Sequence, residues 1–175
     1  GLREITYRNN AFLLDISGKI IASKGYLGLI NKNNINQALE KVEETGILRF
    51  NGLPVDEAQV LYLDVTKDTE VENPLETLTA IELLATQRKH KNKILDYQNS
   101  GLIIKPYAKS MSDSLAIYLK YKEIIKNKSP KNQIYIEKIG FETIENFKNT
   151  IRLERHLGTF KDIRKAFKTD SEKIM

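Results

Sequence analysis

The chain has 175 residues, of which 41% are hydrophobic, and a formal net charge of +5, so we expect one domain spanning 1–175 rather than two large ones. The absence of cysteine excludes disulfides, a cysteine nucleophile and a thiolate metal site, and His90 and His156 are too far apart to form a paired zinc motif. No apolar run reaches the roughly 20 residues of a membrane span and no signal peptide is visible, so we expect a cytoplasmic protein. From Gly1 and the ending Ser171–Met175 we expect a piece of a longer protein.

The first fifty residues are predicted to form a small β-β-α-β unit. Gly18 supplies the backbone angles of a tight turn between two strands, and Gly46 fits the left-handed end of a helix. The predicted elements are strands at 11–16 and 19–23, a helix that begins after Asn33 or Asn34, a strand at 47–50, and a turn at Asn51-Gly52 and Pro54.

The stretch Val60–Asp68 is predicted to be a half-buried or central strand, because apolar and β-branched residues dominate it. Asp64 does not fit this apolar pattern. A carboxylate in an apolar strand loses its hydration, which is unfavourable unless a cation, a metal or a hydrogen-bond donor compensates the loss. Asp64 is interpreted either as half of an ion pair with an Arg or Lys of a neighbouring strand or as a metal ligand. Asp68 would share its face only if the strand continues, and Lys67–Thr69 is typical of a strand end.

The rest of the chain alternates helices and short strands. Pro74 favours the start of a helix that continues toward His90 and is apolar enough to pack on a sheet. His90 lies among basic residues, where a solvent-facing or phosphate-contacting imidazole is favoured over a catalytic one. The further predicted elements are strands at 102–104, 114–123, 133–139 and 150–157, helical turns at 141–147, and a closing helix capped by Thr159.

Two of these strands carry candidate functional side chains. Alternation along 114–123 places Tyr118 with Lys120 and Lys122, where the phenol is either an amphipathic filler or an activated nucleophile. Alternation along 150–157 places Arg152, Glu154 and His156 opposite a mostly apolar face. This charged row forms either a cross-strand ion-pair ladder or a phosphate site.

Basic residues are concentrated between Arg88 and Lys138, whereas Glu70 to Glu82 is acidic. Clustered Lys and Arg neutralise phosphates, so the asymmetry favours a polyanionic partner. The alternative is a lysine-rich surface of the kind that AT-rich coding sequences produce, together with many Asn and Ile residues.

Strands and helices without regular β-α alternation indicate an α+β fold, with an antiparallel or mixed β-sheet covered by helices. The order of the motifs resembles the replication-initiation proteins of the filamentous-phage gene-two type and related phage and plasmid replication proteins of Bacteroidetes. The resemblance covers about Phe12 to Phe167, and its short motifs lie at 16–20, 33–35, 63–68, 114–123 and 151–155.

The resemblance implies a protein that nicks single-stranded or hairpin DNA through a tyrosine, which becomes linked to the 5′-phosphate, with Mg²⁺ or Mn²⁺ as cofactor. It makes Tyr118 the first nucleophile candidate and Tyr121 the reserve, with Lys120 assisting. The candidate metal ligands are Asp64, Asp68, Glu123 and Glu154, and the candidate DNA contacts are Lys105, Lys109, Lys120, Lys122, Arg152 and Arg155.

The sequence departs from many rolling-circle initiators in one respect, because it has no His-hydrophobic-His pair to bind a metal. Either acids replace the histidines, as a hard cation permits, or the domain binds DNA without cutting it. The alternative from another class is therefore a non-catalytic DNA-binding or protein-interaction module.

Overall fold

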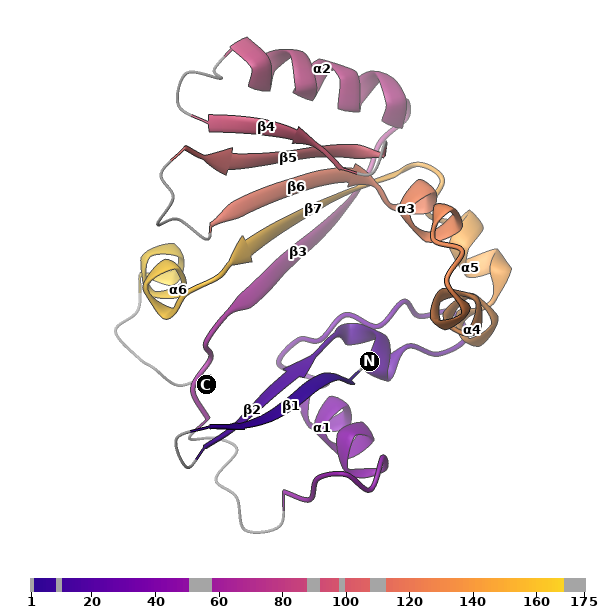
Figure 1. Ribbon diagram of the computed structural model, residues 1–175. Coiled ribbons are helices and arrows are strands. Elements are labelled where there is room, and N and C mark those ends of the chain that lie inside the picture. Colours follow the sequence, from indigo (N-terminus) through magenta and orange to yellow (C-terminus); the bar gives the residue numbers. More distant parts are fainter. Residues whose placement is uncertain are drawn as a thin grey trace. The chain divides into compact units, whose positions relative to one another are not determined.

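A computed structural model gives the structure and describes residues 2–8, 11–50, 58–87, 92–97, 100–107 and 113–168. Over these residues the chain has an α+β fold with two antiparallel sheets, which confirms the predicted class (Figure 1). It divides into two compact units. The first is built from Gly1–Leu53 and Lys128–Glu145, and the second from Pro54–Asn127 and Asn146–Met175.

The second unit contains a five-stranded antiparallel sheet with the strand order β3-β7-β6-β5-β4. Its strands are β3 (Leu63–Glu70), β4 (Asn92–Asp96), β5 (Gly101–Pro106), β6 (Ser114–Leu119) and β7 (Thr150–Leu157). The strand predicted at 150–157 is confirmed as β7. The strand predicted at 60–68 is β3, but it lies at the edge of the sheet and continues to Glu70, so Asp68 is inside the strand.

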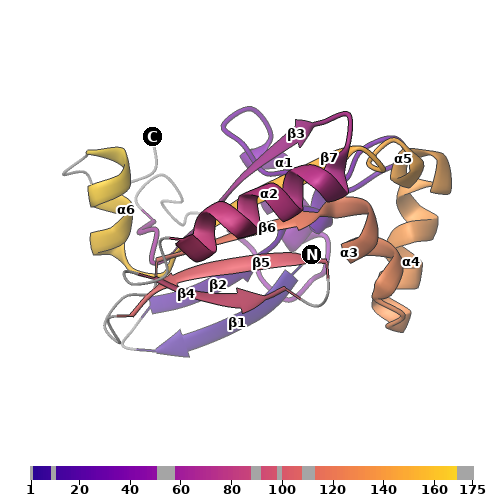
Figure 2. The ribbon, with the colours of Figure 1, turned by 90° about the horizontal axis from the view of Figure 1, so that it is seen from above.

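Helix α2 (Pro74–Gln87) lies along one face of this sheet (Figure 2). Alternation along β5, β6 and β7 directs one apolar row toward the helix, and the buried members of that row are Leu102, Ile117, Leu119 and Ile151. Leu78, Ile81 and Ala85 pack on them from α2, at the spacing of one helix face. The predicted packing of this helix on a sheet is therefore confirmed.

The first unit combines a hairpin with helices. Strands β1 (Leu2–Arg8) and β2 (Ala11–Ile16) pair with each other, followed by a 3-10 turn, η1 (Gly18–Ile21), and by α1 (Ile35–Glu43), α4 (Pro130–Ile139) and α5 (Phe141–Glu145). Its core includes Ala38, Val42, Ile139 and Ile144, all buried. The Tyr135 hydroxyl donates a hydrogen bond to the Leu27 carbonyl at 2.8 Å, which ties α4 to the loop before α1.

Four of the predicted strands, at 19–23, 47–50, 114–123 and 133–139, are wrong in whole or in part. Residues 19–23 form η1 and the loop after it, so β2 pairs with β1 instead, and 47–50 is not a strand. Residues 133–139 belong to α4, because the Ser129 side chain accepts a hydrogen bond from the Asn132 N–H and Pro130 suits a first helical turn.

The strand predicted at 114–123 ends at Leu119, where α3 (Lys120–Lys126) begins. The predictions for the helix after Asn34, the turns at 141–147 and the helix after Thr159 are confirmed by α1, α5 and α6 (Phe160–Phe167). The predicted turn at Asn51-Gly52 and Pro54, the surroundings of His90 and the ending after Lys168 lie outside the described residues. In the described part of the chain, no helix combines the length and the apolar character needed to cross a bilayer.

Candidate functional site

The face of the five-stranded sheet opposite α2 carries a row of polar side chains. In the strand register, β7 lies between β3 and β6, so that Arg152 is opposite both Asp68 and Tyr118. Two residues further along β7, Glu154 is opposite Thr66 and Ala116. Two residues beyond that, His156 is opposite Asp64. We call this surface the polar face, and it consists of Asp64, Asp68, Tyr118, Arg152, Glu154 and His156.

Arg152 and Asp68 form a two-point ion pair in the polar face. Arg152 Nε and Nη2 donate to the two carboxylate oxygens of Asp68, each at 2.6 Å, and Arg152 is only 5% exposed. Burial alone would lower the pKa of Arg152, but the Asp68 carboxylate raises it above its ordinary value. The guanidinium is therefore permanently charged and fixed in one orientation beside Tyr118.

Tyr118 is buried and hydrogen-bonded to an acid. Its hydroxyl donates to Glu154 Oε2 at 2.9 Å, its exposure is 2%, and the Tyr97 ring stacks on it with 4.4 Å between ring centroids. Gly101 is opposite Tyr118 in β5, where an added Cβ would lie 2.5 Å from the Tyr118 Cβ. Burial and then the Glu154 charge raise the pKa of Tyr118, so the resting group is a neutral phenol.

The first turn of α3 contributes a second buried ion pair. Lys120 Nζ lies 2.6 Å from Glu123 Oε2 and 5.9 Å from the centroid of the Tyr118 ring. Tyr118 and Lys120 are close, as expected. They are brought together by the turn from β6 into α3, and not by alternation along one strand. Tyr121 and Lys122 lie on α3, both partly buried, so the predicted alternation face of Tyr121 does not exist.

Asp64 is bonded to a histidine, not to the Arg or Lys that the ion-pair interpretation expected. His156 Nδ1 lies 2.6 Å from Asp64 Oδ1, and the two side chains are 44% and 32% exposed. Because β3 is an edge strand, Asp64 keeps contact with solvent. The desolvation that motivated a metal at this position is therefore smaller than its apolar sequence neighbours indicate.

The four predicted metal ligands do not converge on one point. Asp68 and Glu123 are paired with cationic side chains, while Asp64 and Glu154 are bonded to His156 and Tyr118. Within the described ranges, no three His, Asp or Glu side chains are grouped so as to hold a metal ion. A single ion held by all four acids does not fit this arrangement.

The predicted DNA contacts are spread over the second unit. Lys105 is exposed in β5, and the strand register places it on the same face as Glu154. Arg155 lies on the opposite face, opposite Leu115, where it is paired with Asp113 at 2.6 Å. Lys120 and Arg152 are buried in their ion pairs, Lys122 is partly exposed, and Lys109 lies outside the described residues.

The sequence patterns do not identify Tyr97, because they predict no strand between His90 and Gly101. Asn92–Asp96 is a short strand, and its apolar residues Ile94 and Leu95 are adjacent, so no alternation is visible over it. The turn-forming residues Asn99, Ser100 and Gly101 before the next apolar run are the signal that could have indicated a hairpin there.

The family model for the N-terminal part of the replication-associated gene-two protein matches residues 31–169. This range contains the whole polar face and leaves out the β1–β2 hairpin. The resemblance to gene-two-type replication proteins that the sequence motifs predicted is confirmed by this match. No curated protein and no solved structure matches the chain significantly.

Proposed function

Because the chain belongs to the family of replication-associated proteins that the gene-two N-terminal model describes, we propose that it initiates replication by binding single-stranded or hairpin origin DNA and cutting one strand through Tyr118. The observation that carries this proposal is the hydrogen bond of 2.9 Å from the Tyr118 hydroxyl to Glu154, with Arg152 opposite Tyr118 on the neighbouring strand. A nucleophile, a base within hydrogen-bond reach and a fixed cation are the parts that phosphodiester cleavage by a tyrosine needs.

In the proposed step, Tyr118 Oη attacks a backbone phosphorus while the phenol proton passes to Glu154. A bond forms between Tyr118 and the phosphorus, and the bond to the 3′ oxygen breaks. The 3′ oxygen takes a proton from water, and Glu154 returns its proton to the hydroxide that this leaves. The products are a free 3′ hydroxyl and a 5′-phosphate joined to the protein. Glu154 is needed because the raised pKa of Tyr118 makes spontaneous ionisation rare, and Arg152 compensates the negative charge that develops.

The polar face also supports binding of the DNA backbone. Lys105 is exposed on the same face as Glu154, and its register partner in β4 is Lys93, also exposed. Two ammonium groups side by side on a sheet surface suit a phosphate backbone, and their contribution to affinity falls as salt rises. Lys122 on α3 is a further contact in the proposal.

In the proposed function, Asp64 is the residue that would bind Mg²⁺ or Mn²⁺. Its carboxylate is 32% exposed and bonded to His156 through one oxygen, and Mg²⁺ is commonly held by one or two carboxylates together with phosphate oxygens. Asp68 and Glu123 do not fit as ligands, because each lies 2.6 Å from a cationic nitrogen. A bound ion would neutralise charge on the phosphate.

The burial of Tyr118 favours a second candidate function, which is DNA binding without cleavage. A phenol that is 2% exposed and stacked under Tyr97 reaches a phosphorus only if Tyr97 or the DNA rearranges. In that case the Tyr118–Glu154 and Arg152–Asp68 pairs hold the strands of a DNA-binding or protein-interaction module together.

Cleavage of end-labelled single-stranded and hairpin DNA pools separates the two candidates. We expect the wild-type chain to cut with Mn²⁺ or Mg²⁺, and we expect Glu154→Gln to cut about 10²- to 10⁴-fold more slowly, the usual contribution of a general base. Binding of the same pools should weaken with rising salt in both proteins. Salt-sensitive binding without cleavage by the wild type would favour the binding-only candidate, and absence of binding would reject both DNA functions.

A further inference from the structure

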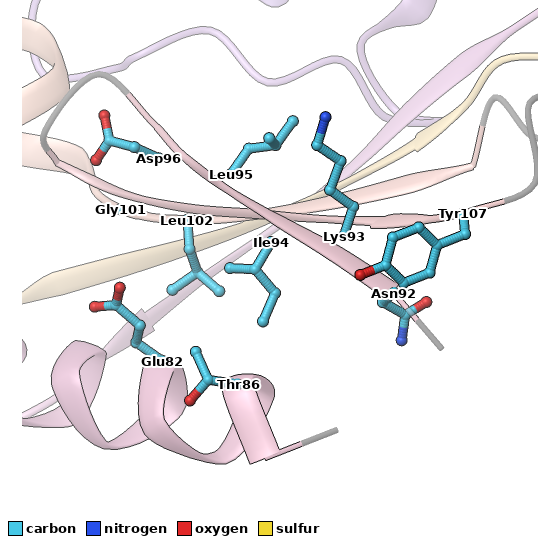
Figure 3. Close-up of a pocket in the computed structure, with 10 residues that line it drawn as sticks. All are labelled: Glu82, Thr86, Asn92, Lys93, Ile94, Leu95, Asp96, Gly101, Leu102 and Tyr107. Carbon is cyan, nitrogen blue, oxygen red and sulfur yellow. The ribbon is translucent and has the colours of Figure 1, made fainter. Parts of the chain in front are cut away.

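A hollow of about 370 Å³ lies on the other side of the sheet from the polar face, between α2 and β4 (Figure 3). Ile94 and Leu102 lie on the α2 side of their strands, and Glu82 and Thr86 come from the helix. Lys93, which also lines the hollow, extends to the opposite side of β4 in Figure 3. The hollow thus has an apolar base with an acidic side chain on its helix wall.

The hollow lies along an edge strand. Over the described ranges, β4 pairs with β5 and with no other strand. An edge strand presents a row of backbone N–H and C=O groups to which a second extended chain can pair. Peptide recognition of this kind takes affinity from the main chain and specificity from every second side chain.

The charge of α2 indicates what would bind. Helix α2 contains two acids, Glu76 and Glu82, and no Lys or Arg, in a chain whose net charge is +5. Leu75, Leu83 and Leu84 on α2 are 58%, 60% and 63% exposed. None of these leucines lines the hollow, so the charge of its lining indicates the ligand, and Glu82 disfavours a phosphate backbone here.

We propose that β4 and the α2–β4 hollow form a docking site for an extended segment of a partner protein, which adds to the sheet beside β4 and carries basic residues on either side of an apolar one. The apolar side chain would cover Ile94 and Leu102, and the basic ones would meet Glu82 and Asp96, which also lines the hollow. A second copy of β4 does not fit, because pairing about Ile94 would put Asp96 opposite Asn92 and bring no base to Glu82. The site does not depend on the proposed DNA cleavage.

A synthetic peptide tests the proposal on the full chain. The probe is fluorescein-labelled Gly-Thr-Lys-Thr-Ile-Thr-Lys-Thr-Gly with blocked ends, and binding is followed by polarisation at low salt. We expect it to bind, and we expect a peptide with Glu in place of both Lys residues to bind at least tenfold more weakly. Glu82→Lys should weaken binding of the basic peptide about tenfold or more. Glu76→Lys, the same charge change on α2 but outside the lining of the hollow, should change it less than threefold.

The backbone contribution is tested with the protein unchanged. Methylation of alternate peptide nitrogens on the edge that pairs with β4 should abolish binding, whereas methylation of the other edge should leave it intact. The proposal is overturned if the basic peptide does not bind, if the acidic peptide binds equally, or if Glu82→Lys and Glu76→Lys have the same effect. Equal binding of the two methylated peptides would overturn strand addition.

Discussion

Adjacent residues of β6 and β7 are buried on opposite faces of the five-stranded sheet. One face buries apolar side chains, and the other buries hydrogen-bonded polar side chains. Ile117 and Ile151 are buried in the apolar row under α2, whereas the adjacent Tyr118 and Arg152 are equally buried in the polar face but bonded to Glu154 and Asp68. The apolar face needs volume and shape, while the polar face needs each donor matched to an acceptor. A single substitution on either face therefore disturbs the fold for a different physical reason.

The largest effect is expected from Ile151→Ala on the apolar face. Ile151 is fully buried among apolar neighbours, so the deletion leaves a cavity and should lower the free energy of unfolding by about 4 kcal/mol. Urea denaturation measures the change. Leu153→Ala, two residues away on the same face but only partly buried, should cost clearly less. Equal costs would mean that the two side chains are equally buried.

Breaking the ion pair of the polar face should cost nearly as much. Asp68→Asn leaves the buried Arg152 guanidinium without a counter-charge, and we expect the free energy of unfolding to fall by about 3 kcal/mol. The double substitution Asp68→Leu with Arg152→Met removes both charges and should recover most of the loss. If the double variant were as unstable as the sum of its single changes, the pairing would not explain the burial of Arg152.

The pH dependence at high pH distinguishes the polar face from the rest of the molecule. The folded state keeps the Tyr118 proton above pH 10, where the unfolded state loses it, because burial raises the pKa of this phenol. The free energy of unfolding should therefore fall as pH rises above about 10, by about 1.4 kcal/mol per pH unit more in the wild type than in Tyr118→Phe. Parallel pH profiles from urea denaturation would contradict the buried phenol.

The smallest effect is expected at the exposed end of the polar face. Asp64→Asn weakens a bond between two partly exposed groups, so it should change the free energy of unfolding by less than about 1 kcal/mol. If Asp64 is a metal ligand, Mn²⁺ should raise the melting temperature of the wild type and not of this variant, because ligands that bind only the folded state stabilise it. An equal increase in both proteins would leave Asp64 as the partner of His156 alone.

The sequence predicts which residues of β7 share the polar face, but not which side chains they bond to. Alternation along 150–157 placed Arg152, Glu154 and His156 together, as the structure has them, because side chains of a strand alternate without exception over eight residues. The bonding partners of these side chains were not predictable from the sequence. They lie on β3 and β6, and long segments of chain separate both strands from β7. Alternation also placed Lys122 beside Tyr118, which is wrong because the strand gives way to α3 after Leu119.

The errors in the first unit have a local cause. Residues 133–139 are rich in Ile and Tyr, which are typical of strands, but Ser129 and Pro130 supply a helix cap and a first turn, and these local signals prevail. The Ser17-Gly18 turn signal predicts a hairpin partner after β2, whereas the partner is β1, which lies before it in the chain.

The central claim, that Tyr118 is the nucleophile poised on Glu154, is tested most directly by mapping a covalent adduct. Wild-type protein is incubated with Mn²⁺ and single-stranded or hairpin DNA, digested with trypsin, and the nucleotide-linked peptide is sequenced by mass spectrometry. The account predicts a 5′-phosphate on Tyr118, lost in Tyr118→Phe and retained in Tyr121→Phe, with DNA binding nearly unchanged in both. An adduct on Tyr121, or no adduct from protein that binds and is folded, would contradict it.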